Sequence, residues 1–275
     1  MGSSKRPAPP ASPQYDAVEP WSGRAGSQRR AGQLLLMMGT AAIFIASAVG
    51  ESLPLSMFAG VPSGIPAVVA GLAIGLAAFA AAWLSPPALL GWPIVVAWIS
   101  AAALTAWSMV EAGPAIEAAV STIEALVLAA ASLVLIRNGT SNRALRWLLT
   151  VMLLMFGTIH LLFRPAIAGL MPDFIPFAAI WPWITGILLI ASGLATLFKA
   201  FRGYALLIVA AMFLAWVPLI HVPRLLASFS IGEVTFAAMA IALAGSLIIC
   251  RATECLDPER APLGFCPSTL AKLGG

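Results

Sequence analysis

The chain has 275 residues, of which 61% are hydrophobic and only 9% are charged. Soluble domains carry about 25% charged residues, so this composition excludes an ordinary soluble domain and predicts an all-α integral membrane protein. The formal net charge of +4 is spread over short polar stretches rather than over a solvated basic domain. We therefore expect the lipid bilayer as the main partner and no nucleic acid.

The N-terminal residues 1–33 are rich in Pro, Ser, Gly and Arg and lack hydrophobic periodicity, which predicts a disordered cytoplasmic tail. Arg29-Arg30 ahead of an apolar run, followed by Ala46-Ser47-Ala48, resembles a cleavable signal. The charge distribution of the whole chain favours the alternative, a first span that is retained.

Eight apolar segments follow, each near the length of roughly 20 residues that crosses a bilayer. They cover residues 34–50, 65–84, 91–110, 120–137, 145–163, 178–198, 203–222 and 232–250. Glu117 and Glu124 interrupt the fourth segment. The sequence therefore predicts eight transmembrane helices.

Lysine and arginine predict the orientation, because cytoplasmic loops carry an excess of both. With eight spans and the N-terminus inside, all of the 15 basic residues except Arg164 and Arg224 fall on the inner side. This bias predicts a multi-pass membrane protein with its N-terminus on the inner side. Both termini, including a C-terminal tail over 251–275, are expected in the cytoplasm.

Similar motifs recur in the two halves of the chain at a nearly constant offset. The pattern P-x-x-I-P occupies 62–66 and again 172–176, and Ala-Trp occurs at Trp107 and 109 residues later at Trp216. We interpret this recurrence as an internal duplication.

The duplication divides the chain into two tandem four-helix bundles, over 34–138 and 143–250. Four spans return a chain to its starting side, so both units are expected to have the same, parallel orientation. Glu124 and Glu233 also differ by 109 positions. Because Glu233 opens the eighth span at the outer surface, Glu124 is expected to open the fourth span there.

Polar residues gather at the predicted outer end of the second unit. They are His160, Arg164, Asp173, His221, Arg224 and Glu233. One interpretation is a structural cap, in which the arginines bond the two carboxylates and loop carbonyls. The other is a binding site for a quinone head group or another small ligand, because imidazole can exchange protons near neutral pH.

Several chemistries lack their motifs. The chain has no CxxCH for haem, no histidine pair across two facing spans, no phosphate-binding loop and no GxGxxG. We therefore predict no metal, name no catalytic residue, and expect a quinone as the cofactor if the site has one. A stand-alone enzyme is the less favoured expectation.

Five short motifs occur in order in the second unit. They are Gly157-Thr158-Ile159-His160, Met171-Pro172-Asp173-Phe174-Ile175-Pro176, Trp183-Ile184-Thr185-Gly186, Ala215-Trp216-Val217-Pro218-Leu219-Ile220-His221-Val222-Pro223-Arg224 and Glu233-Val234-Thr235-Phe236. With these motifs the second unit resembles the DoxX-like family of bacterial membrane proteins. The resemblance implies a four-helix bundle, adds Trp183 to the candidate ligand-binding residues, and identifies the first unit as a degenerate copy.

Some members of that family are subunits of quinone-linked oxidoreductases. The resemblance therefore implies an accessory or quinone-interacting subunit of a redox system in the bacterial inner (plasma) membrane, with a redox subunit as partner. Two alternatives stay open: a small-molecule transporter with its site between the two units, and a non-catalytic membrane scaffold. A scaffold predicts a self-satisfied polar cluster with no adjoining cavity.

Overall fold

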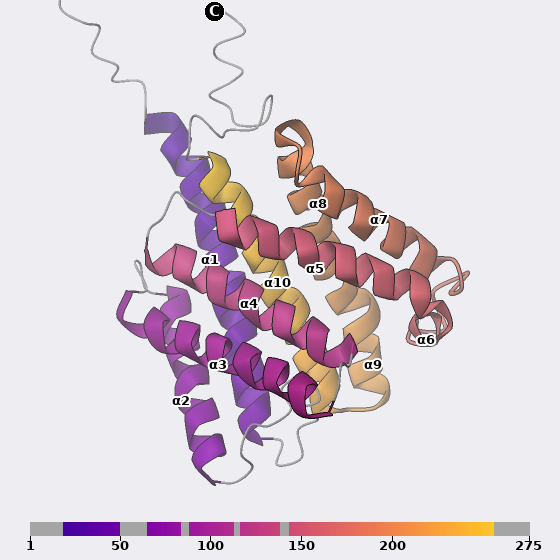
Figure 1. The fold of residues 1–275 in the computed structure, drawn as a ribbon, viewed down its shortest axis with the longest axis horizontal. Helices are drawn as coiled ribbons and strands as arrows, with labels where there is room; N and C mark the ends of the chain where they lie inside the picture. Colours follow the sequence, from indigo (N-terminus) through magenta and orange to yellow (C-terminus); the bar gives the residue numbers. More distant parts are fainter. Residues whose placement is uncertain (1–18, 50–64, 84–87, 113–115, 138–142, 256–275) are drawn as a thin grey trace, which may run out of the picture.

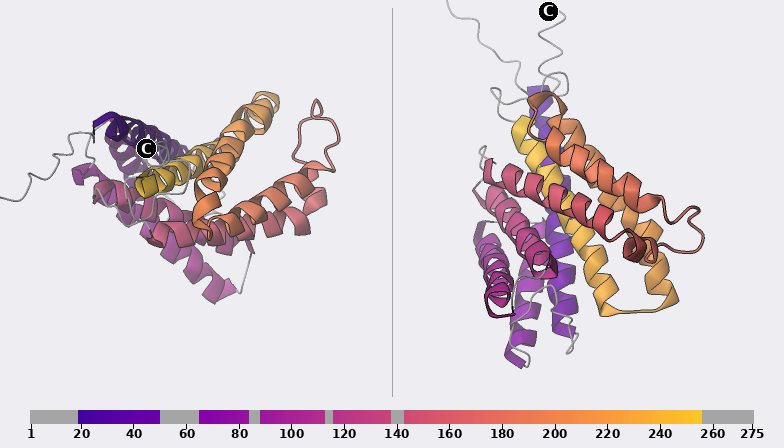
Figure 2. Two further views of the ribbon diagram at one scale, coloured as in Figure 1. Left: turned by 90° about the horizontal axis from the view of Figure 1, so that it is seen from above. Right: turned by 45° about the vertical axis from the view of Figure 1, so that its right-hand side comes forward.

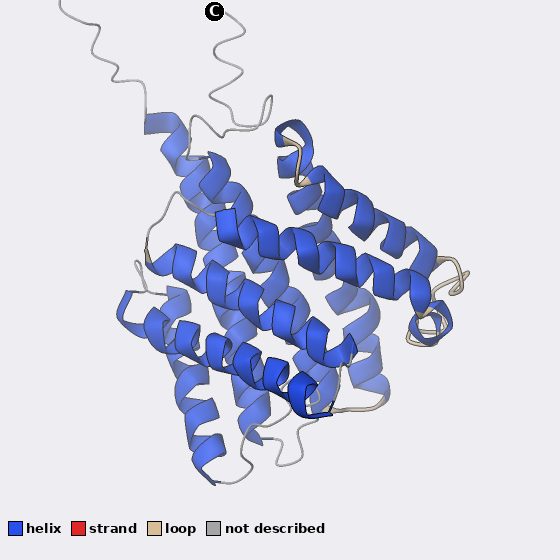
Figure 3. Ribbon diagram, viewed as in Figure 1, coloured by secondary structure: helices blue, strands red, loops and turns tan. Residues whose placement is uncertain are grey.

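The computed structural model describes residues 19–49, 65–83, 88–112, 116–137 and 143–255, and these are almost entirely helical, with no strand among them (Figure 3). Eight long helices coincide with the eight apolar segments. They are α1 (Glu19–Val49), α2 (Ile65–Trp83), α3 (Ala88–Ala112), α4 (Ile116–Ile136), α5 (Arg143–Leu162), α7 (Trp181–Ala195), α8 (Lys199–Trp216) and α10 (Ile231–Cys255) (Figure 1). Three short helical segments accompany them: α6 (Arg164–Ala168), the π-helix η1 (Val217–His221) and α9 (Val222–Ala227).

The length and composition of these helices are those of a membrane protein. Within the described ranges, four stretches are long and apolar enough to cross a membrane: Ala118–Ile136, Arg143–Leu162, Lys199–Ala227 and Ile231–Thr253. Leu72–Trp83, Gly91–Trp107 and Trp181–Ala195 are apolar but shorter. The expectation of an all-helical membrane protein is therefore confirmed, whereas the count of eight crossings stays a prediction.

The first and last helices are longer than their apolar segments. α1 begins at Glu19, so residues 19–33 are helical and not part of a disordered tail, and α10 continues to Cys255, past the predicted end of its span. The extension has a physical reason: the polar start of α1 packs on the end of α10, where Arg251 Nη1 donates to Gln28 Oε1 over 2.7 Å. Residues 1–18 and 256–275 lie outside the described part.

Small residues allow α1 and α10 to pack closely as an antiparallel pair. A Cβ at Gly39 would lie 2.6 Å from the carbonyl oxygen of Ala238, and one at Gly245 would meet the backbone of Leu36 and Gly32. Small side chains permit such approach between helices in lipid. The same device joins α5 to α7, where Gly157 faces the Gly186 carbonyl.

Helix pairing repeats between α1–α4 and the set α5, α7, α8 and α10. α1 packs on α2 as α5 packs on α7, and α3 packs on α4 as α8 packs on α10. Across the two sets, α1 packs on α10 and α5 packs on α4. α10 lies between α1 and α8 in the centre of the molecule (Figures 1 and 2).

Two arginines about three turns into α1 bond the ends of α2 and α4. Arg30 Nη2 donates to the Trp83 carbonyl over 2.8 Å, and Arg29 Nη2 donates to the Leu135 carbonyl over 3.2 Å. The last carbonyls of a helix have no partner within the helix, so cationic side chains stabilise them. These contacts hold the ends of α2 and α4 against the first half of α1.

Candidate functional site

The site begins with a local irregularity in the helix that runs through α8, η1 and α9. Pro218 and Pro223 have no backbone N–H, so the regular α-helical bonds cannot form at either residue. The chain instead widens into a π-turn, in which the Val222 N–H donates to the Val217 carbonyl, five residues back. Such turns are frequent at functional sites. Here His221 is the last residue of the π-turn, and Arg224 lies in α9, directly after it.

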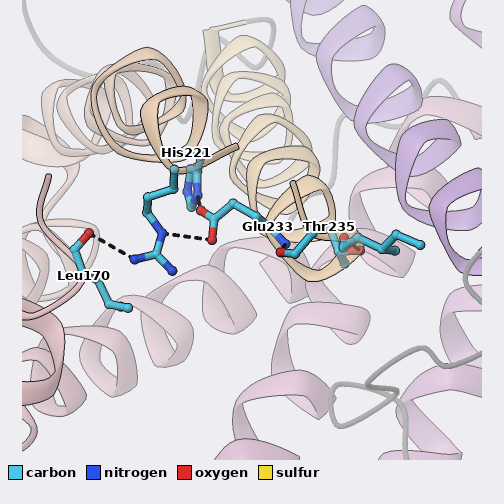
Figure 4. A network of polar contacts seen from close by, with 7 residues as sticks. Leu170, His221, Glu233 and Thr235 are labelled. Atoms are coloured by element: carbon cyan, nitrogen blue, oxygen red, sulfur yellow. Dashed lines mark hydrogen bonds and ion pairs between the residues drawn. The ribbon is translucent and has the colours of Figure 1, made fainter. Parts of the chain in front are cut away.

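Glu233, in the first turn of α10, joins these two side chains. His221 Nδ1 lies 2.6 Å from Glu233 Oε1, and Arg224 Nε donates to Glu233 Oε2 over 2.9 Å (Figure 4). Arg224 Nη1 also reaches the Leu170 carbonyl at 3.3 Å, and the Glu233 N–H donates to Ser230 Oγ over 3.1 Å. Both oxygens of this buried carboxylate are therefore satisfied by charge-assisted bonds.

His160 lies near the end of α5, opposite α8. Its Nδ1 is 2.8 Å from the Phe156 carbonyl, and its ring stacks on Trp216 with the ring centroids 5.7 Å apart. A carbonyl only accepts, so Nδ1 donates, and a neutral imidazole then presents Nε2 as an acceptor. His221, with Nδ1 on a carboxylate, has the same arrangement. In the described part of the chain neither Nε2 has a hydrogen-bond partner.

Arg164 and Asp173 do not form the pair that a structural cap would contain. The Arg164 guanidinium carbon lies 4.1 Å from the centroid of the Trp183 ring, and its Nη1 donates to the Leu161 carbonyl over 2.9 Å. Asp173 is exposed in the loop after α6. A cation over an indole ring is stabilised by the ring quadrupole, so Arg164 needs no carboxylate.

A cavity of about 510 Å³ adjoins the Glu233 network. His160, His221, Arg224 and Glu233 all line it, whereas Arg164, Asp173 and Trp183 do not. The rest of the wall is mainly apolar and aromatic, with Phe156, Phe163, Ile167, Phe213, Trp216, Phe236 and Met239 among its residues. A partly open apolar cavity with a few convergent polar groups is the usual form of a small-molecule site.

Glu124 is a lining residue that the sequence did not indicate as part of the site. It lies in the middle part of α4, roughly two turns after the helix begins at Ile116, and not at the start of the helix. It is 5% exposed, and its Oε2 is buried without a hydrogen-bond partner among the described residues. An acidic residue inside an apolar segment was the available signal, because such residues are costly in a membrane and usually face the protein interior.

The described residues contain no group of three or more His, Cys, Asp or Glu side chains that could hold a metal ion. The fold and the site define a helical membrane protein with an apolar cavity that ends in a polar cluster. No protein-family model, curated protein or solved structure matches the chain. The resemblance to the DoxX-like family therefore stays a prediction.

Proposed function

We propose that the protein is a DoxX-like inner-membrane protein that binds the head group of a membrane quinone in this cavity, as an accessory subunit of a redox system. The observation that carries the proposal is the pair of lining imidazoles in a mainly apolar cavity, each held through Nδ1 and with no partner for Nε2 among the described residues. Its volume of about 510 Å³ lies within the range of roughly 300–1,000 Å³ for small-molecule sites.

The chemistry of the wall suits an aromatic ring with oxygen substituents. Phe156, Phe213 and Trp216 supply flat apolar contact. The imidazoles supply hydrogen bonds and can exchange protons near neutral pH. Electrons would come from or go to a redox partner subunit.

The proposed topology has eight crossings and two parallel four-helix units. The helix pairings support the duplication. Each pair of helices in contact within α1–α4 has an equivalent pair in contact within the set α5, α7, α8 and α10. Arg29 and Arg30, which bond the ends of α4 and α2, and Arg251 near the end of α10 support a cytoplasmic location for that end. The cavity then opens near the periplasmic side.

Binding of a decyl-substituted benzoquinone to the protein in mild detergent tests the proposal. Native mass spectrometry should show one bound molecule, and His160→Ala and His221→Ala should each weaken binding at least about tenfold, as for loss of one good hydrogen bond at about 1.4 kcal/mol. Thr158→Ala is the control, because its hydroxyl bonds the Leu154 carbonyl on the same helix and lies outside the cavity. Equal binding by all four proteins would refute the quinone site, and so would failure of the wild type to bind both this quinone and its reduced form.

A small-molecule transporter is the second candidate, and two observations favour it. The cavity wall includes α4 of the first unit together with helices of the second, and the helix at the site is interrupted by η1. Transport sites are typically formed by broken helices between repeats. The scaffold alternative is less well supported, because a cavity adjoins the polar cluster.

Accessibility distinguishes a transporter from a binding subunit. Cysteine placed at Ile220, which lines the cavity, would be probed in sealed vesicles with a membrane-impermeant maleimide after replacement of the native cysteines by serine. A binding subunit should be labelled from the periplasmic side alone. Labelling from both sides would favour alternating access.

A further inference from the structure

We propose that the cavity selects the hydroxyl-bearing, reduced form of its ligand, a hydroquinone, and that Glu124 accepts a hydrogen bond from one of the hydroxyls. This inference rests on the proposed function and adds to it a ligand state and a contact residue from the first unit. It follows from counting which hydrogen-bonding groups of the wall are already engaged.

The donors of the wall are mostly engaged with protein acceptors. Nδ1 of His160 donates to Phe156, and Nδ1 of His221 donates to Glu233. Arg224 donates through Nε and once through Nη1, and keeps one Nη1 hydrogen and both Nη2 hydrogens on a side chain that is 35% exposed. The Thr185 hydroxyl donates to the Trp181 carbonyl over 2.8 Å.

The acceptors of the wall are in part unengaged. Nε2 of His160 and of His221 each present a lone pair when the ring is neutral. Glu124 Oε2 is buried and has no partner among the described residues, in contrast to Glu233, whose two oxygens both accept. A carboxyl group keeps an acceptor oxygen in either protonation state.

A wall rich in acceptors discriminates between the two redox forms of a quinone. A hydroquinone brings two O–H donors, whereas a quinone brings only carbonyl acceptors. A site that hydrogen-bonds a hydroxyl rejects an analogue lacking it strongly, because its own buried polar groups are then left unpaired. The unpartnered Glu124 oxygen is such a group, and a ligand hydroxyl would satisfy it.

The test compares three probes with one tail: decyl hydroquinone kept reduced under anaerobic conditions, the decyl quinone, and the dimethyl ether of the hydroquinone. The ether keeps the ring and both oxygens but has no donor and cannot be oxidised to the quinone without losing its methyl groups. Wild-type protein should bind the hydroquinone at least about tenfold more tightly than either other probe.

Glu124→Leu should abolish this preference, and Ser132→Ala should retain it. Ser132 is the matched control because its buried hydroxyl also lacks a partner among the described residues, on the same helix, yet lies outside the cavity. A second variant, Glu124→Gln, gives an independent measurement. In infrared difference spectra, binding of the hydroquinone should change a carboxyl band of the wild type. The same change should be missing from the spectra of Glu124→Gln.

The outcomes separate the two proposals. Equal affinity for all three probes would overturn the selection of the reduced form and leave the quinone site standing. A preference that survives in Glu124→Leu, with no carboxyl band change in the wild type, would overturn the role of Glu124. Failure of every probe to bind would overturn the proposed function together with this inference.

Discussion

Two buried glutamates at the cavity differ in how they are satisfied. Glu233 and Glu124 are each 5% exposed. Glu233 accepts from His221 and Arg224, whereas Glu124 Oε2 has no partner in the described part of the chain. A paired buried charge is destabilised by removal of its partner, but an unpaired polar group costs stability as it stands. Removal of the two side chains should therefore change the free energy of unfolding in opposite directions.

Substitution of each glutamate should show that difference. Glu233→Ala leaves Arg224 and His221 without their acceptor and should lower the free energy of unfolding by about 1–3 kcal/mol. Glu124→Leu removes an unsatisfied group at similar volume and should leave stability unchanged or raise it. Thermal unfolding in detergent measures both. The reverse order of melting temperatures would show that Glu124 is the structural residue of the two.

At the scale of the helices, hydropathy alone predicts most of the fold. The segments at 65–84 and 120–137 match α2 and α4 closely, because a helix that crosses lipid must be apolar over its whole length. α6, η1 and α9 were not predicted, since proline positions determine them. The apolar segment at 203–222 conceals η1, whereas α6 and α9 lie in the stretches that follow predicted segments. The extension of α1 depends on its contact with α10, which no local pattern encodes.

Most of the candidate site, like most of the fold, could be predicted from the sequence. Helix-end reasoning placed His160, His221, Arg224 and Glu233 at one end of the second unit, where the structure brings them around one cavity. The partner of Arg164 was not predictable, because an indole ring serves an arginine as well as a carboxylate does. Glu124 was missed since its place depends on how α4 packs on α5 and α10.

The close packing of α1 on α10 should depend on Gly245. A methyl group at this position meets the backbone of Leu36 and Gly32, which cannot rotate away as a side chain can. Gly245→Ala should therefore destabilise the protein by about 1–3 kcal/mol, the usual cost of overpacking.

Gly26→Ala, in the partner helix α1, is the matched control for that substitution, because no atom of another described segment lies within 4 Å of the new methyl group. It should be neutral or slightly stabilising, since alanine favours a helix over glycine by up to about 1 kcal/mol. Unfolding in detergent, followed by circular dichroism, measures both variants. Similar melting temperatures would mean that α1 and α10 move apart at little cost.

At the scale of the whole molecule, charge and packing agree on one polar end. Arg29 and Arg30 bond helix-terminal carbonyls of α4 and α2, and Arg251 bonds Gln28 at the start of α1. Arg164 and Arg224 lie at the other end, where a ring and a carboxylate hold them. The two arginines that depart from the charge bias thus each have a local reason for their position.

This arrangement predicts the topology in the membrane. Green fluorescent protein fused after residue 140 or after residue 255 should fluoresce, and alkaline phosphatase fused at the same positions should be inactive. The reason is that four and eight crossings return the chain to the cytoplasm. A fusion after Ser230, between α9 and α10, should give the opposite result. It tests the cavity end directly, since Glu233 follows within the first turn of α10. Phosphatase activity at residue 140 would contradict this topology, because either the number of crossings before α5 would be odd or the N-terminus would lie outside.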